Sequence, residues 1–278
     1  MQPQYLVVPI TCQDEEIDLL VYYLTDMGFE AFEEKGNTLE AYVLIADYKE
    51  SALKTLLAEH FPSAQLQAVK TLDNINWNEE WEKNFDPITV NKQLRVRAIF
   101  HEPDPEVEME LVIQPKMSFG TGHHSTTRLM MEEILGLSLE GQSVVDAGCG
   151  TGILAILTEK RGAKEVLAYD IEDWAFENSI ENTNLNSCNK VKVLQGTIGT
   201  LSIADQSADV LLANINRNIL LEEMKEYARV LKPQGILLLS GFYDEDIDML
   251  TQEANRFGIE VLASKKKDKW SLMRCIKA

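Results

Sequence analysis

The stretch of this chain best suited to chemistry is a glycine-rich turn that follows a short apolar run containing Asp146. Its glycines are Gly148, Gly150 and Gly152, a G-x-G-x-G spacing that is shorter than the G-x-G-x-x-G of dinucleotide-binding folds. Glycine has no Cβ and tolerates positive φ, so the backbone of such a turn can approach a ligand closely. The helix expected after the turn also offers free N–H groups. The turn therefore predicts a ligand-binding site.

An acidic residue at the end of the next apolar run extends this pattern. Asp170 follows the run 166–169 and stands twenty residues after Gly150. A carboxylate at the tip of the second strand is placed to hydrogen-bond a ribose diol. The pair predicts an adenosine-containing cofactor, and the short glycine spacing disfavours NAD. With Asp146 before the glycines, the turn resembles motif I of the class I S-adenosylmethionine-dependent methyltransferases.

A second polar stretch, residues 118–127, precedes an expected helix and contains two glycines and three threonines. The adjacent His123 and His124 raise the question of a metal, but no carboxylate or third histidine stands at ligand spacing. We therefore expect no metal here. We expect a glycine-flanked loop whose hydroxyl groups cap the helix or hold a ligand.

Composition limits the classes of protein that fit. Hydrophobic residues make up 45% and charged residues 26% of the 278, and no apolar run approaches the roughly 18 residues of a membrane span. The net charge of −19 disfavours an electrostatic grip on nucleic acid. Four scattered cysteines without a C-x-x-C fit a reducing compartment. We expect a cytoplasmic protein without direct nucleic-acid or membrane partners, and a monomer because no apolar repeat suggests an interface.

The acidic charge is concentrated near the start of the chain, where the first sixty residues hold 12 acidic and 3 basic side chains. Residues 1–71 read as a βαββαβ unit of ferredoxin-like order. Thr11 is expected to cap its first helix, and Ala52 is expected to face the core from its second. The unit has no catalytic pattern, so it is either a recognition module for a basic partner or a packing appendage.

Residues 72–87 read as a linker with a helix, because Trp77, Trp81 and Phe85 fall on one helical face. The third predicted region, 88–278, begins with two alternating strands joined by a turn at 101–105.

From residue 143 onward strands and helices alternate regularly, which predicts a doubly wound parallel sheet. A final antiparallel hairpin turns through the lysine-rich run 265–269, which is expected to be solvated. Ligands bind such sheets at the carboxyl ends of the strands. Gly148, Asp170 and Asn214 follow the first, second and fourth of these strands, so all three are expected along one edge.

Five motifs carry a resemblance to a known family. They are Phe119-Gly120-Thr121-Gly122-x-His124-x-Thr126-Thr127, the Asp146–Ala155 turn, Asp170, Ala213-Asn214-Ile215 and Leu239-Ser240-Gly241. Together they resemble the bacterial ribosomal protein L11 methyltransferases. The resemblance is strong over the predicted catalytic region. The acidic N-terminal unit resembles the family in its predicted architecture.

The resemblance implies methylation of lysine ε-amines and of the N-terminal α-amine of that ribosomal protein, which the acidic N-terminal unit would recognise. It implies that S-adenosylmethionine is held by Thr127, Gly148, Asp170 and Asn214, with Gly150 and Gly152 in the same turn. We also expect Phe119, Thr126 and His124 at the acceptor pocket, and Asn214 to orient the amine. His124 is a candidate general base, and a purely structural histidine is the alternative.

Two departures from the family pattern stand out. Asn216-Arg217 replaces the usual Leu-Ala, which affects the expected acceptor pocket, and Ser125 replaces a common proline. Three other readings stay open at this point: a different protein or RNA acceptor, a non-catalytic nucleoside-binding module associated with the ribosome, and, more distantly, an NAD oxidoreductase.

Overall fold

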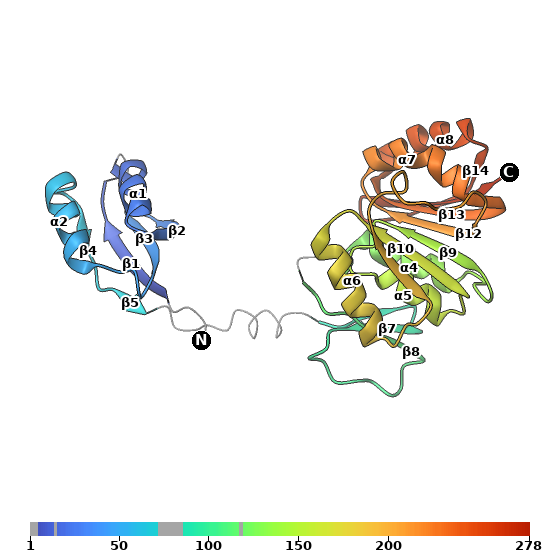
Figure 1. Ribbon diagram of the computed structural model, residues 1–278, viewed down its shortest axis with the longest axis horizontal. Coiled ribbons are helices and arrows are strands. Elements are labelled where there is room, and N and C mark those ends of the chain that lie inside the picture. The colour runs from blue at the N-terminus through green and yellow to red at the C-terminus, as the bar shows by residue number, and fades with distance from the viewer. Residues whose placement is uncertain (1–4, 14–15, 72–85, 117–118) are drawn as a thin grey trace. The chain divides into compact units, whose positions relative to one another are not determined.

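The computed structural model describes residues 5–13, 16–71, 86–116 and 119–278, with only the backbone of Asp18 (Figure 1). The chain divides into two compact units, Met1–Asn84 and Phe85–Ala278. Our domain boundaries at 71/72 and 87/88 stay a prediction. The predicted linker helix with Trp77, Trp81 and Phe85 lies outside the described residues.

The N-terminal unit is a small antiparallel sheet with two helices. Its strands follow the order β2-β3-β1-β4, and β5 also pairs with β1. This is the ferredoxin-like order expected from the sequence. Its elements are β1 (Tyr5–Thr11), α1 (Ile17–Asp26), β2 (Phe29–Lys35), β3 (Thr38–Leu44), α2 (Glu50–His60), β4 (Gln65–Leu66) and β5 (Lys70–Thr71).

Alternation along β1 and β3 builds the core of this unit, since every second side chain faces the helices. The core residues include Val8, Ile10, Leu20, Leu24, Leu39, Ala41, Val43, Leu53 and Leu57. Two expectations were wrong. Thr11 ends β1 rather than capping α1, and Ala52 is exposed because Leu53 takes the core-facing position of that turn.

The C-terminal unit is a doubly wound sheet, as predicted. Its elements are β6 (Ile88–Val90), β7 (Leu94–Arg97), β8 (Met109–Val112), α4 (Ser125–Leu135), β9 (Ser143–Ala147), α5 (Ile153–Lys160), β10 (Glu165–Asp170), α6 (Asp173–Leu185), β11 (Val191–Gln195), β12 (Ala208–Asn214), α7 (Arg217–Val230), β13 (Leu231–Tyr243), η2 (Asp244–Asp246), α8 (Ile247–Arg256), β14 (Ile259–Lys267) and β15 (Trp270–Lys277).

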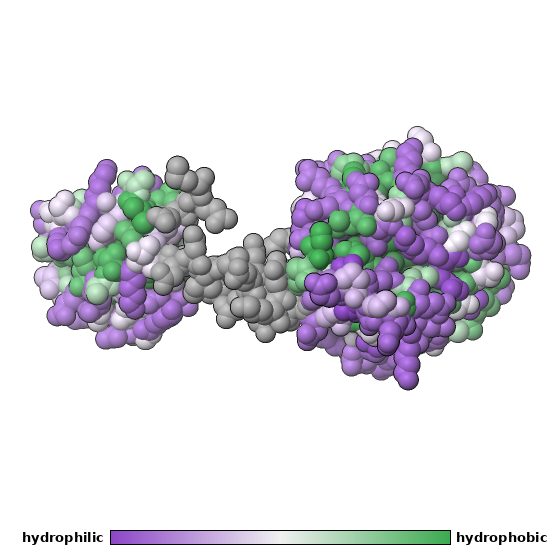
Figure 2. All heavy atoms as spheres, turned by 90° about the horizontal axis from the view of Figure 1, so that it is seen from below, coloured by the Kyte–Doolittle hydropathy of each residue, from purple (hydrophilic) through white to green (hydrophobic). Residues whose placement is uncertain are grey.

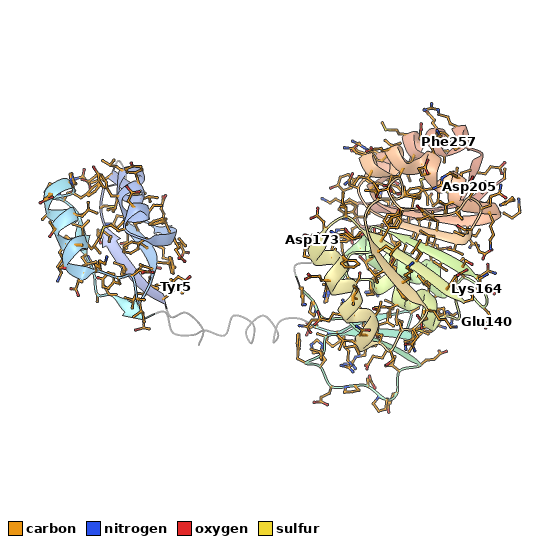
Figure 3. The ribbon with its side chains drawn as sticks, viewed as in Figure 1. Tyr5, Glu140, Lys164, Asp173, Asp205 and Phe257 are labelled. Carbon is orange, nitrogen blue, oxygen red and sulfur yellow. The ribbon has the colours of Figure 1, made fainter. Side chains whose placement is uncertain are left out.

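The main sheet has the order β11-β10-β9-β12-β13-β15-β14. Its strands are parallel except that β15 runs antiparallel to β13 and β14. Val144 faces the side covered by α4 and α5, and Val145 faces the side covered by α7 and α8. The strands are continuous apolar runs because both of their faces are buried. Side chains fill the space between the layers; of the labelled residues, Lys164 immediately precedes β10 and Asp173 begins α6 (Figure 3).

The segment before this sheet differs from the expectation. β7 and β8 pair in parallel, with Leu94 opposite Met109, so residues 98–108 cross over rather than forming a simple hairpin turn. The outer edge of β8 is covered by α6, where the Asn186 side-chain oxygen accepts from the Val112 N–H at 2.9 Å.

The lysine-rich run forms the solvated hairpin turn that was predicted, since Lys265, Lys266 and Lys269 are exposed. β14 continues to Lys267, Lys265 pairs with Glu133 at 2.5 Å, and Lys266 pairs with Asp244 at 2.7 Å.

Hydrophilic side chains cover most of the face seen in Figure 2, with apolar areas between them. None of the helices within the described ranges is long and apolar enough to cross a membrane.

Candidate active site

The glycine turn after β9 has a shape that requires its glycines. Gly148, Gly150 and Gly152 have φ values of 65°, 54° and 78°. A Cβ on Gly148 would run into the Ile215 side chain, and one on Gly150 into the Phe119 carbonyl oxygen. Side chains are excluded both by the backbone conformation and by close neighbours. The turn therefore forms a backbone cradle that packs closely against neighbouring segments, and its Gly148 and Gly150 line a cavity.

Asp146 holds this cradle from beneath. Its side chain is 1% exposed, and its Oδ2 accepts from the Ala155 N–H at 3.0 Å. Burial raises the pKa of the Asp146 carboxyl to about 7, and the nearby Asp170 carboxylate raises it further, against the opposing hydrogen bond. Because it joins the end of β9 to the first turn of α5, we assign Asp146 to the scaffold.

Asp170 connects the second strand to the same turn. Its Oδ2 accepts from the Gly150 N–H at 2.9 Å, and its Oδ1 accepts from the Glu172 N–H at 3.1 Å. Carboxylate oxygens each carry a further lone pair, so the group can also accept from a diol. The side chain is partly exposed and lines the cavity above the strand ends.

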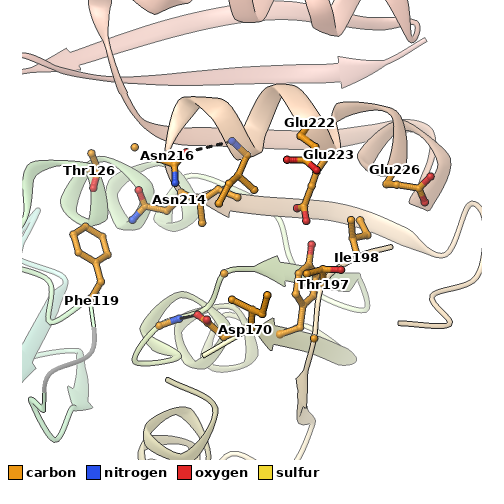
Figure 4. Close-up of a pocket in the computed structure, with 18 of the residues that line it drawn as sticks. Phe119, Thr126, Asp170, Thr197, Ile198, Asn214, Asn216, Glu222, Glu223 and Glu226 are labelled. Atoms are coloured by element: carbon orange, nitrogen blue, oxygen red, sulfur yellow. Dashed lines mark hydrogen bonds between the residues drawn. The ribbon is translucent and has the colours of Figure 1, made fainter. Parts of the chain in front are cut away.

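That cavity has a volume of about 710 Å³, which is in the range of small-molecule sites. Phe119, Thr126 and Asn214 lie at one end of it, and Thr197 and Ile198 at the other (Figure 4). Its lining residues are Phe119, His124, Thr126, Gly148, Gly150, Tyr169, Asp170, Ile171, Trp174, Gly196, Thr197, Ile198, Gly199, Asn214, Ile215, Asn216, Ile219, Glu222, Glu223, Glu226, Gly241 and Trp270. The structure thus brings almost all the predicted site residues together.

Asn214 presents an unused acceptor to this cavity. The side chain is 8% exposed, and its Nδ2 donates to the Thr127 hydroxyl at 3.4 Å. Its Oδ1 is buried and makes no hydrogen bond. An unsatisfied buried acceptor costs about 1–3 kcal/mol, so it indicates a ligand donor. Thr127 is fully buried and does not line the cavity, and it contacts the cavity residue Asn214 through this hydrogen bond.

His124 has a structural task in the loop before α4. It caps that helix, with its Nδ1 accepting from the Thr126 N–H at 3.3 Å and lying 2.7 Å from the Thr126 hydroxyl. Burial lowers the pKa of His124, and the charge of Lys269 lowers it further. The ring is therefore held neutral with Nδ1 as acceptor, which leaves that nitrogen unable to act as a free base.

An aromatic row at the mouth of the cavity was missed from the sequence. The ring centroids of Phe119 and His124 lie 5.1 Å apart, those of His124 and Trp270 4.7 Å, and those of Trp270 and Tyr243 4.5 Å. Trp270 opens the last strand, far from the glycine turn in sequence. Its position after a lysine run gave no periodic signal that could have found it.

The residues that depart from the family pattern, Ser125 and Asn216-Arg217, each make a contact with a nearby residue. Ser125 donates to Asp268 Oδ2 at 2.5 Å, which ties the start of α4 to the β14–β15 turn. Asn216 lines the cavity and caps α7 by accepting from the Ile219 N–H at 3.2 Å. Arg217 pairs with the buried Asp246 at 2.8 Å.

These features fit a nucleoside cofactor with an amino-acid tail. The glycine cradle gives close backbone approach, Asp170 can accept from a ribose diol, and the free Asn214 oxygen can accept from an N–H donor. NAD is not favoured, because the third glycine of its fingerprint is Ile153 here, a buried residue of α5.

Comparisons with known proteins agree with the geometry. The family model described as "Ribosomal protein L11 methyltransferase (PrmA)" matches residues 7–278. A ribosomal protein L11 methyltransferase of Porphyromonas gingivalis is 44% identical over 261 residues, covering 92% of this chain and 89% of the relative. One of Bacteroides fragilis is 41% identical over 269 residues, with 95% of each chain covered.

Among solved structures, a ribosomal protein L11 methylase from Lactobacillus delbrueckii subsp. bulgaricus superposes with a TM-score of 0.65 at 25% identity. The match covers 70% of this chain and 100% of that one. With the glycine cradle, the Asp170 carboxylate and the asparagine after the fourth strand in one cavity, the chain belongs to the ribosomal protein L11 methyltransferase (PrmA) family, class I enzymes whose methyl donor is S-adenosylmethionine.

Proposed function

We propose that this enzyme methylates amino groups of ribosomal protein L11, both lysine ε-amines and the N-terminal α-amine. The observation that best supports this proposal is the buried side-chain oxygen of Asn214, which has no hydrogen-bond donor. Asn214 lies beside Phe119 and Thr126 at one end of the cavity. An amine is a donor that fits this acceptor. The names of the relatives supply the protein substrate.

The cavity residues divide between the parts of the cofactor. Gly148 and Gly150 would face its amino-acid end through the backbone, and Asp170 would accept from its ribose diol. Gly152 does not line the cavity and would act by shaping the turn. Thr127 would act by holding the Asn214 amide. When bound, S-adenosylmethionine supplies an electrophilic methyl group on a sulfonium.

The acceptor amine must arrive neutral, because its lone pair attacks the methyl carbon. A free lysine with a pKa near 10.4 is neutral in only about one in a thousand copies at pH 7.4. The apolar mouth formed by Phe119 and Trp270 would disfavour the charged form and so lower the amine pKa. The Asn214 oxygen would accept one N–H and leave the lone pair directed at the methyl group.

In the reaction the new N–C bond forms as the S–C bond breaks, and the electron pair of that bond stays on sulfur. The methylated ammonium then loses its proton to solvent. His124 does not serve as base in this scheme, because its Nδ1 caps α4.

We further propose that the N-terminal unit recognises the substrate protein. Its acidic excess can steer a basic ribosomal protein. Leu19 is 52% exposed and Tyr22 63% exposed on α1, which gives the unit apolar contact surface as well. A single chain in the cytoplasm, with no direct nucleic-acid contact, remains our expectation.

The test is methyl transfer from isotope-labelled S-adenosylmethionine to three pools: free ribosomal protein L11, assembled ribosomes and tRNA. Intact mass and peptide mapping would locate the label. We expect label on amines of the free protein. Label on RNA alone would overturn the acceptor assignment but not the cofactor. No label on any pool, with cofactor still bound, would point to another acceptor or to a binding module.

A further inference from the structure

The cavity continues beyond Asp170 into a region that the reaction scheme above does not use. We call it the distal lobe and define it by Thr197, Ile198, Tyr169 and three glutamates of α7, namely Glu222, Glu223 and Glu226. The glutamates face Thr197 and Ile198 across the cavity (Figure 4). The acceptor end with Asn214 and Phe119 lies on the opposite side of Asp170.

The order of sites along the cavity determines which part of the cofactor reaches this lobe. This step rests on the proposed placement of the ribose at Asp170 and of the methyl group near Asn214. A nucleoside held in that direction must direct its base away from Asn214, into the lobe. Ile171 and Ile198 supply apolar surface for the faces of the base. The polar groups of the lobe then meet its edge.

Glu223 is the glutamate that is available and positioned for such contact. Glu222 is exposed, and the Glu226 carboxylate already accepts from Arg229 Nε at 2.6 Å. Glu223 is partly buried, and its Oε2 accepts from the Tyr227 hydroxyl at 2.7 Å. Tyr227 is itself fully buried, so it fixes the carboxyl group at the cavity wall. Carboxylate oxygens have several acceptor sites, so the group can accept a further donor from a ligand.

Tyr169 provides a second, independent sign that the lobe is built for a ligand. Its side chain is 3% exposed and lines the cavity, and its buried hydroxyl makes no hydrogen bond of good geometry, although the Glu223 carboxylate is near. Burial raises the pKa of Tyr169, and the Glu223 carboxylate raises it further, which shows that the two groups are near each other. A fixed acceptor and a hydroxyl without a well-formed hydrogen bond therefore lie together in the wall of the cavity.

We propose that Glu223 recognises the 6-amino group of the cofactor's adenine, and that Tyr169 supplies the adjacent donor for the ring nitrogen N1. Adenine presents one donor and one acceptor on this edge, which matches the two side chains. Hypoxanthine presents a 6-carbonyl and an N1–H, so the carboxylate of Glu223 faces a second acceptor, whereas the Tyr169 hydroxyl can still accept from the N1–H. Glu223 is thus a specificity-determining residue of the cofactor site.

The probes for this proposal are S-adenosylhomocysteine and S-inosylhomocysteine, which differ only at the 6-position and N1 of the base. Binding of each to the full chain is measured by isothermal titration calorimetry, without substrate protein. We expect the wild-type protein to bind the adenosyl compound about 10- to 100-fold more tightly. In Glu223→Gln the amide can donate to a 6-carbonyl, so the ratio should approach one.

Matched variants separate this proposal from the placement on which it rests. Glu222→Gln makes the same chemical change at the exposed neighbour and should keep the wild-type ratio. Asp170→Asn should weaken both compounds equally if the ribose lies at Asp170. If Asp170→Asn leaves the affinities for both compounds unchanged, the proposed placement of the ribose at Asp170 is wrong. This conclusion holds for any ratio of adenosyl to inosyl affinity.

Two results would overturn the role of Glu223: no preference in the wild-type protein, or a preference that Glu223→Gln retains. Thermal unfolding of each variant checks folding. If Glu223→Gln does not fold, Tyr227→Phe releases the carboxyl group and should reduce the ratio in the same direction. An unchanged ratio in a folded Tyr227→Phe would then count against the proposal.

Discussion

The two sides of the cavity are built from different parts of the polypeptide. The side that we propose for the cofactor is made mainly by backbone: three glycines in the left-handed region, arranged by one β-turn-α unit within residues 143–160. The side that we propose for the acceptor is made by side chains from the loop before α4, the end of β12 and the start of β15. A backbone site depends on steric space, whereas a side-chain site depends on distant segments meeting correctly. The two sides should therefore respond differently to mutation.

The largest effect is expected from Gly150→Ala. The new Cβ would meet the Phe119 carbonyl oxygen at a φ of 54°, so both the clash and the backbone strain apply. We expect a fall of several kcal/mol in the unfolding free energy and a loss of at least about 100-fold in cofactor affinity. Denaturant unfolding and calorimetry measure these quantities.

The matched control is Gly258→Ala, at a φ of 72° with nothing within 4 Å of the added Cβ. It should cost only the backbone strain, about 1–2 kcal/mol, and leave cofactor affinity unchanged. Similar losses in both variants would show that steric space around the cradle is not what the glycines supply.

The second prediction concerns the buried Asp146 beneath the cradle. Its pKa is raised to about 7 in the folded protein, above the ordinary value of 3.8, so the folded state binds the proton more tightly than the unfolded state. This group therefore destabilises the fold progressively as the pH rises from about 4 to 7, by at most about 4 kcal/mol. Asp146→Asn, which keeps an oxygen for the Ala155 N–H, should remove that loss.

Chemical denaturation of both proteins at several pH values would test this. The informative quantity is the difference between the two curves, because carboxyl groups with lowered pKa values, such as Glu110 and Asp209, act in the opposite direction in both proteins. A difference that does not change between pH 4 and 7 would contradict the prediction.

Third, Asn214→Ala probes the point where the two sides meet. Loss of the oxygen that orients the amine should lower kcat about 100-fold. Cofactor affinity should fall by less than about tenfold, because the substitution removes at most one hydrogen bond to the cofactor. Thr127→Val, which removes only the partner of the Asn214 amide, should show a smaller loss in kcat. Unchanged turnover in Asn214→Ala would exclude the proposed role.

The smallest effect is expected from Ser125→Ala on the acceptor side. The exposed bond to Asp268 ties the loop to the hairpin that carries Trp270. Its loss should lower kcat/KM for the protein substrate roughly threefold and leave cofactor affinity intact. Asp268→Asn should give an effect of similar size. A change confined to cofactor affinity would place this contact on the wrong side of the cavity.

Much of the fold was predictable because its signals are local. The doubly wound sheet follows from apolar runs alternating with amphipathic segments, and the ferredoxin-like unit follows from the spacing of residues such as Leu20, Leu24, Leu39 and Ala41. The wrong predictions concern features for which the local sequence pattern allows more than one structure. The parallel pairing of β7 with β8 is an example, because alternation along two strands does not specify their relative direction.

The sequence by itself determined which residues lie together at the carboxyl ends of the central strands. Gly148, Gly150, Asp170 and Asn214 could be placed on one edge because parallel strands end together, a property of chain order alone. Tertiary structure decided the rest. It set Thr127 behind Asn214, used His124 as a helix cap, and brought Trp270 and Glu223 to opposite ends of the cavity. These contacts join residues far apart in the chain, and only packing determines which of them meet.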